Sequence, residues 1–170
     1  MRILFFLFFI SPFLIVAQDV EQKLKDQKIE LFKPSAPIAN YVKAVRVGNL
    51  IYLAGHGPTK ADGTHITGKV GKDLTIEQGY MAARQSAISI LSTLKAEIGD
   101  LNKVKRIVKV LGLVNCTNDF IEHPKVINGF SDLIVSIFGE KGLHARSAVG
   151  TNSLPLNITV EVEMIVEVTE

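Results

Sequence analysis

Residues 144–169 read HARSAVGTNSLPLNITVEVEMIVEVT, and the second half of this stretch decides the fold. From position 160 onward the side chains alternate: Val160, Val162, Met164, Val166 and Val168 occupy one set of positions, and Glu161, Glu163, Ile165, Glu167 and Thr169 the other. Because successive side chains of a β-strand point to opposite faces, this strand has one apolar face that can pack on helices. Its other face is mixed and stays available to water or to another subunit, which favours symmetric association.

Two charged residues of this stretch are candidates for a functional site. Arg146 lies in the first extended segment and Glu161 opens the last strand, so the two side chains could face one small pocket. A guanidinium can hold a carboxylate and a glutamate can handle a proton, which predicts a site for a small carboxylate substrate. On pattern alone, Arg146 could instead form an interface salt bridge, and Glu161 could be one of several acids on a solvated strand face.

Upstream of this stretch, the sequence predicts a β-hairpin. Residues 41–47 alternate, Gly48 and Asn49 supply a turn, and residues 50–54 resume an apolar strand. The glycine-rich residues 55–58 are expected to break that strand. Residues 60–71 then indicate a long loop with a short strand at 66–70.

The middle of the chain predicts two helices around a central strand. Thr75 and Gln78 form a capping box, apolar residues then recur at threes and fours up to Ile98, and Gly99 ends the helix. Residues 104–114 are rich in β-branched side chains and suit a central strand. A second helix is expected at 124–138. The order of elements predicts an α+β fold in which two helices cover one face of a mixed sheet.

The N-terminus indicates export. Arg2 precedes the apolar run 3–10, Ser11-Pro12 follows, and Ala17 stands before the polar Gln18, which is typical of a secretory signal peptide at residues 1–17. We therefore expect a periplasmic or secreted protein, and an uncleaved membrane anchor is the alternative. Residues 18–33 predict a short helix or a mobile arm, and residues 34–170 form one domain.

Charge and cysteine content exclude several classes of protein. Without residues 1–17 the chain has 18 basic and 17 acidic side chains, so it lacks the positive surface expected of a nucleic-acid-binding protein. Cys116 is the only cysteine, which rules out an intramolecular disulfide and indicates a small buried side chain. The four histidines lack the spacing of metal ligands, so no metal site is expected.

Several segments together resemble the RidA/YjgF family of reactive-intermediate deaminases. The residues that carry the resemblance are 40–45, 48–55, Gln85, 104–115, Ala145-Arg146-Ser147, Leu154-Pro155 and Val160-Glu161-Val162-Glu163. The resemblance implies a chorismate-mutase-like fold and a homotrimer with sites at the subunit interfaces. It also implies no cofactor.

The resemblance further assigns roles to individual residues. Arg146 would bind the carboxylate of a 2-imino or 2-enamino acid, and Glu161 would position the water that hydrolyses it to a 2-keto acid and ammonia. Tyr41 would line the pocket, and backbone groups at Gly55 and Ala148 would contact the ligand. An imine carbon is already electrophilic, so this chemistry needs neither a metal nor a covalent nucleophile.

The chain also departs from the best-known branch of that family. Ala148 replaces a cysteine, His56 replaces an uncharged polar residue, and an insert at 139–143 precedes Arg146. These differences indicate a divergent subgroup whose substrate can differ; for His56 a structural role is favoured over a proton-donating one. The leading functional hypothesis is a hydrolase similar to 2-iminobutanoate/2-iminopropanoate deaminase. A trimer that binds a small carboxylate without turnover is the alternative, and an endoribonuclease is a third hypothesis that the near-neutral charge does not favour.

Overall fold

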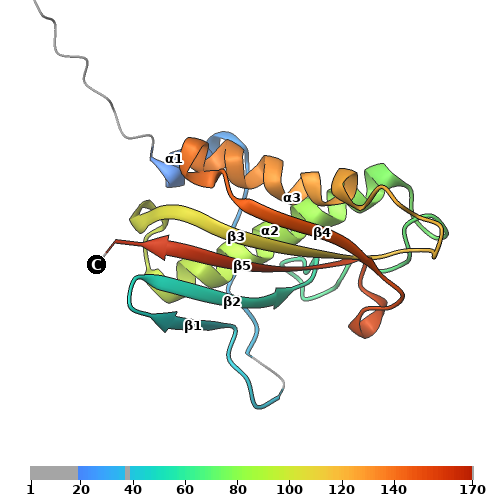
Figure 1. Cartoon of the computed structure of the whole chain (residues 1–170). Coiled ribbons are helices and arrows are strands. Elements are labelled where there is room, and N and C mark those ends of the chain that lie inside the picture. The colour runs from blue at the N-terminus through green and yellow to red at the C-terminus, as the bar shows by residue number, and fades with distance from the viewer. Residues whose placement is uncertain (1–18, 37–38, 170) are drawn as a thin grey trace, which may run out of the picture.

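A mixed five-stranded sheet forms the centre of the computed structural model, which describes residues 19–36 and 39–169. The strands lie in the order β1-β2-β5-β3-β4 (Figure 1). Only β3 and β4 pair in parallel, and the other neighbours are antiparallel. The strand bounds are Ala44–Val47 for β1, Leu50–His56 for β2, Val104–Asn115 for β3, Ala145–Thr151 for β4 and Val160–Val168 for β5. The signal peptide expected at 1–17 lies outside the described residues.

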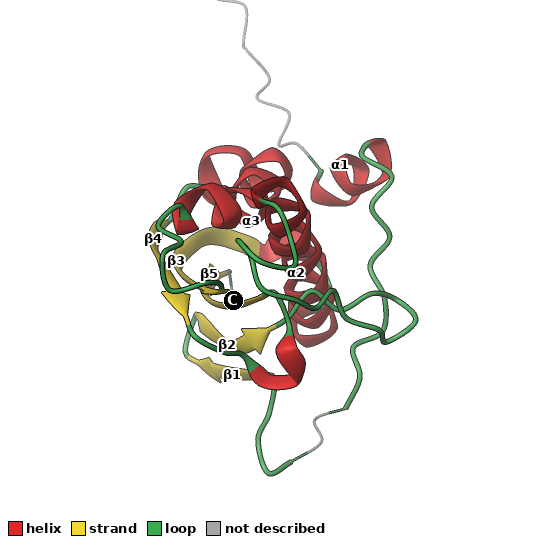
Figure 2. Cartoon of the chain, turned by 90° about the vertical axis from the view of Figure 1, so that its right-hand side faces the viewer, coloured by secondary structure: helices red, strands yellow, loops and turns green. Residues whose placement is uncertain are grey.

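Two long helices, α2 (Ile76–Ile98) and α3 (His123–Phe138), cover one face of this sheet, and no long helix of the described residues covers the other (Figure 2). The short helix α1 (Val20–Asp26) packs beside α3. Single turns of 3-10 helix occur at Leu101–Lys103, Gly139–Gly142 and Pro155–Asn157. The predicted α+β arrangement is confirmed. None of the described helices is both long enough and apolar enough to cross a membrane.

The alternation along β5 is the basis of the core. Val160, Val162, Met164, Val166 and Val168 are each at most 1% exposed and face the helices, where they meet apolar side chains of α2 and α3. Glu161 and Glu163 lie on the opposite, open face of the sheet. Burying one such apolar side chain stabilises the fold by about 1.5–3 kcal/mol, which explains why β5 occupies the middle of the sheet.

The ends of both helices follow the sequence signals closely. The Thr75 hydroxyl accepts a hydrogen bond from the Gln78 backbone N–H, and the Gln78 side chain accepts one from the Thr75 N–H. Gly99 ends α2 with a φ of +78°, a conformation that glycine adopts without strain. Helix α3 begins at His123, one residue before the predicted start, with Pro124 in its first turn.

Two details of the hairpin region differ from the prediction. Strand β2 does not break at Gly55 but continues to His56, because a register shift against β5 between Leu53 and His56 accommodates the glycine. Residues 66–70 form no strand of their own and contribute only isolated bridges, such as Thr67 with Ile158. The hairpin itself is confirmed, although its first strand begins at Ala44 rather than at Tyr41.

Candidate functional site

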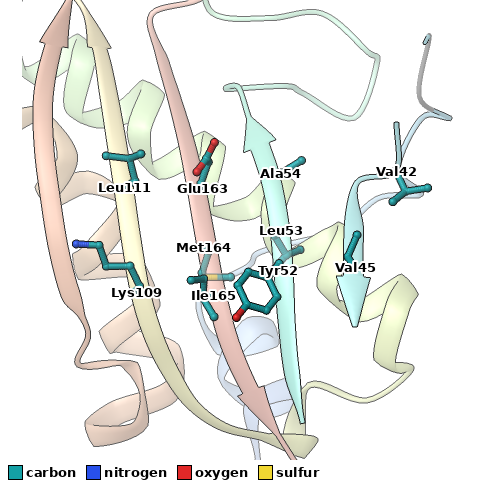
Figure 3. A pocket seen from close by; sticks show the side chains of 10 residues that line it. All are labelled: Val42, Val45, Tyr52, Leu53, Ala54, Lys109, Leu111, Glu163, Met164 and Ile165. Atoms are coloured by element: carbon teal, nitrogen blue, oxygen red, sulfur yellow. The ribbon is translucent and has the colours of Figure 1, made fainter. Parts of the chain in front are cut away.

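The open face of the sheet carries a hollow of about 300 Å³ between β1, β2, β5 and β3 (Figure 3). Its floor is mostly apolar, and Lys109 and Glu163 are the charged side chains in its lining. Val45 and Tyr52, which pair across β1 and β2, are 50% and 43% exposed beside it. Apolar side chains on a bare sheet face mark a surface suited to association with another protein.

Glu161 lies on this open face and is half-buried. Burial raises the pKa of its carboxyl group, and the negative charge of Glu163 raises it further. Gly55 of β2 lies directly against it: a methyl group at Gly55 would come 2.7 Å from Cδ of Glu161. The resemblance predicted that Gly55 and Glu161 belong to one site, and the structure brings these two residues together.

Arg146 lies on the other side of the sheet. It pairs with Val110 of β3, whereas Glu161 pairs with Leu113, three positions further along the same strand. Residues that pair across neighbouring strands have side chains on the same face, and side chains alternate along a strand. Because Val110 and Leu113 are three positions apart, their partners Arg146 and Glu161 point to opposite faces of the sheet. Accordingly, Nη1 of Arg146 donates to Oδ1 of Asn128 (2.9 Å) and to Oγ of Ser131 (3.0 Å), both on α3. Within one chain, therefore, Arg146 and Glu161 do not share a pocket.

The other two residues assigned by the resemblance lie on β4 and ahead of β1. Ala148 shares the helix-facing side with Arg146, but β4 is the last strand of the sheet, so part of its backbone pairs with no other strand of the described residues. Tyr41 precedes β1, is 51% exposed, and is not in the lining of the hollow.

A polar network around Arg146 was not predicted from the sequence. Nδ1 of His144 lies 2.6 Å from the carbonyl oxygen of Gly142 and must therefore carry the proton. Nε2 then accepts from the Ser131 hydroxyl (3.0 Å), whose oxygen in turn accepts from Arg146. Burial lowers the pKa of His144, and the positive charge of Arg146 lowers it further, whereas the hydrogen bond to the Gly142 carbonyl raises it. The imidazole therefore stays neutral and orients the Ser131 hydroxyl toward the guanidinium. The three-residue spacing of Asn128 and Ser131 could have predicted that they share one face of a helix. It could not have predicted that this face lies opposite β4.

The family of the chain follows from a comparison with known proteins. Residues 21–168 match the model of the family described as "YjgF/chorismate_mutase-like, putative endoribonuclease". The chain belongs to the YjgF/RidA family. The resemblance seen in the sequence is thereby confirmed, and the chorismate-mutase-like fold with it.

Several proteins that are similar to this chain match it over most of its length. Protein TCP17 from Trypanosoma cruzi is 42% identical over 149 residues, or 87% of this chain and 93% of that protein. A crystal structure of a "putative endoribonuclease" from Shewanella oneidensis superimposes with a TM-score of 0.85 at 32% identity, covering 89% of this chain and 100% of that one. A 2-iminobutanoate/2-iminopropanoate deaminase from Dermatophagoides farinae is 30% identical over 131 residues, 76% of this chain and 87% of that protein.

Two further features of this member of the YjgF/RidA family concern its histidines and acids. His56 points away from the open face: its Nδ1 donates to the Ala54 carbonyl (2.6 Å) and its Nε2 meets the Thr93 hydroxyl (2.8 Å). Within residues 19–36 and 39–169, no group of three or more His, Cys, Asp or Glu side chains could hold a metal ion.

Replacing Glu163 with glutamine is expected to lower the pKa of Glu161, because the substitution removes the negative charge beside it and leaves its burial unchanged. The titration of the Glu161 carboxyl carbon, followed by NMR, measures this shift. Glu167→Gln is the matched control, since Glu167 is paired with Lys105 instead. An unchanged Glu161 titration in Glu163→Gln would show that the two carboxylates do not interact.

Proposed function

We propose that this protein hydrolyses small 2-imino or 2-enamino acids to 2-keto acids and ammonia, with Arg146 holding the substrate carboxylate and Glu161 positioning the water. The observation that carries the proposal is the half-buried Glu161 on the open sheet face, with a raised pKa and with Gly55 packed against it. A carboxylate whose pKa is raised toward neutrality is a stronger base while it remains ionised. It can accept a proton from water as the oxygen adds to the imine carbon, and then return that proton to the nitrogen to give a carbinolamine. The carbinolamine hydroxyl then loses its proton through Glu161 to the amine, the C–N bond breaks, and the products are the keto group and ammonia.

The Arg146 guanidinium keeps donors for a ligand. Among the described residues only its Nη1 donates to protein groups, so Nε and Nη2 can still form a fork that matches a carboxylate. Asn128 and Ser131 orient the guanidinium from α3, which reduces the freedom that binding must remove.

The site needs more than one chain, because Arg146 and Glu161 face opposite sides of the sheet in a single copy. We infer a homotrimer in which Arg146 of one subunit meets Glu161 of the next. The exposed apolar side chains of the open face, Val45, Tyr52 and Val149, support such an assembly, since association would remove them from water. The resemblance seen in the sequence implied sites at subunit interfaces, which supports this proposal.

Arg146→Ala is expected to lower kcat/KM for imine hydrolysis by about 100-fold, the usual cost of removing one electrostatic contact to a reacting ligand. The imines are generated in place by an amino-acid oxidase, and the rate of imine loss is compared with the uncatalysed rate. Arg84→Ala, on α2, is the control for loss of an arginine elsewhere. Catalysis by the trimeric Arg146→Ala variant at the parent rate would contradict the proposal.

The separation of Arg146 from Glu161 also favours a second candidate, a trimer that binds a small carboxylate without turnover. Arg146 with its α3 partners can hold a carboxylate whether or not Glu161 reaches it. This candidate predicts that 2-keto acids such as pyruvate raise the melting temperature of the parent and not of Arg146→Ala, while no imine is hydrolysed. The two measurements together separate the enzyme from the binding protein.

A further inference from the structure

A second hollow, of about 290 Å³, lies apart from the candidate active site and shares no lining residue with the hollow of the open face. It is bounded by the segment that leads into β1, by the loop at 59–65 and by the hydroxyl-bearing side chains Ser89 and Thr93 of α2. Its lining is rich in polar groups, unlike the apolar floor of the open face. The side chains that carry charge or can titrate there are Lys33, Lys43, Lys60, Asp62 and His65.

The lining of this hollow contains more basic than acidic side chains. Lys33, Lys43 and Lys60 form none of the ion pairs found among the described residues. The only carboxylate in the lining, Asp62, is already engaged: its Oδ1 accepts hydrogen bonds from the backbone N–H (2.9 Å) and the hydroxyl (2.7 Å) of Thr64. Three lysines therefore line a hollow whose single acid accepts hydrogen bonds from its own loop, and Lys33 and Lys60 are exposed there.

Lys43 is the most constrained of the three lysines. It is half-buried, and this burial lowers its pKa. Its Nζ donates to Ser35 Oγ (3.1 Å), the only hydrogen bond of this group among the described residues, although an ammonium has three donors. The same positive charge acts on the buried His56 and helps to lower the pKa of that imidazole. A charge that is partly desolvated and lacks a counter-ion is stabilised by an anion that enters beside it.

The frame of the hollow is held in place without a ligand. The Lys60 N–H donates to the Thr64 carbonyl (2.8 Å), and the Thr59 hydroxyl lies 3.1 Å from Nδ1 of His65, which closes the loop into a tight hairpin. Gln85 of α2 donates to the Thr59 carbonyl (2.7 Å) and fastens this hairpin to the helix. A preformed site loses little conformational freedom when its ligand binds.

We propose that this hollow binds a phosphate group, either as the free anion or as the monoester of a small metabolite. Lysine is a common phosphate-binding residue, and a dianion matches three lysines better than a monocarboxylate does. The hydroxyls of Ser35 and Ser89 supply neutral donors beside the lysines. The inference does not depend on the deaminase proposal, because none of its residues belongs to that site.

Isothermal titration of the chain from residue 18 onward with inorganic phosphate and with glycerol 3-phosphate, at constant ionic strength, tests the proposal. Saturable binding of phosphate is expected, and Lys43→Met should weaken it by about tenfold, the usual effect of losing a hydrogen bond to a charged group. Lys72→Met, on an exposed residue outside the hollow, should bind as the parent does. Tighter binding of the ester than of free phosphate would identify a phosphorylated metabolite as the ligand, and the reverse would identify the free anion.

Backbone NMR locates the binding and is independent of how well the variant folds. In the parent protein, phosphate should shift the amide signals of Lys60 and His65 and not that of Gly55. Absence of saturable binding, equal binding by Lys43→Met, or signal shifts confined to residues outside the hollow would each overturn the proposal.

Discussion

Replacing Gly129 with alanine is expected to destabilise the fold by about 3 kcal/mol. At Gly129, helix α3 comes so close to α2 that an added methyl group would overlap with the backbone carbonyl of Tyr80. The same contact includes Gly79, where an added methyl would come 3.2 Å from Val126, and the Tyr80 hydroxyl, which donates to Asp132 (2.9 Å). Overpacking, which displaces side chains and backbone, typically costs about 1–3 kcal/mol and occasionally more. Here the helices must move apart, which outweighs the gain of about 1 kcal/mol in helix propensity from alanine.

Urea unfolding of the Gly129→Ala variant measures this loss as a lower midpoint. Lys125→Ala, on an exposed position of the same helix, is the matched control; it removes only an exposed ion pair with Glu122 and should change the free energy of unfolding by less than about 1 kcal/mol. If Gly129→Ala were as stable as the parent, α2 and α3 would not be in backbone contact at this position.

Most of the fold could be predicted because its signals are local. The alternation along β5 identifies the face that packs on the helices, and the capping box at Thr75 with the glycine at position 99 gives both ends of α2. Strand β2 was predicted too short because Gly55 reads as a strand breaker. Only its pairing with β5 shows that a register shift keeps it in the sheet. Local sequence patterns do not predict which distant segments pair, or in which register.

The candidate site was harder to predict for the same reason. Small residues occupy much of β4, so its sequence does not say which face is buried, and the side of the sheet on which Arg146 lies depends on its register with β3. Asn128, Ser131 and His144 become part of the site only through that register. By contrast, Glu161 could be placed on the open face directly from the alternation of β5.

The buried His56 makes the fold sensitive to acid. Its side chain is 5% exposed, and burial lowers its pKa to about 4; the hydrogen bond to the Ala54 carbonyl opposes this shift and Lys43 adds to it. In the unfolded chain the imidazole has a pKa of about 6.5, so on acidification the unfolded state takes up the proton first. The stability that depends on neutral His56 is therefore complete above pH 6.5 and is lost as the pH falls toward 4. Each unit of pKa difference corresponds to about 1.4 kcal/mol, so the loss over this range is on the order of 3 kcal/mol.

His56→Gln should consequently flatten the pH dependence of stability, because glutamine does not titrate. Urea unfolding of the parent and of His56→Gln at pH 7 and at pH 4.5 measures the effect. Carboxylates and His144 also make stability depend on pH, but they contribute equally to both proteins and cancel in the comparison. Thr93→Ala is the control: it removes the hydrogen bond to Nε2 but keeps the titrating ring, so it should lower stability at both pH values and retain most of the parent slope. A parent slope that persists in His56→Gln would show that another group takes up the proton. The neutral ring would then serve only to join β2 to α2, since it links the Ala54 carbonyl to the Thr93 hydroxyl across the buried side of the sheet.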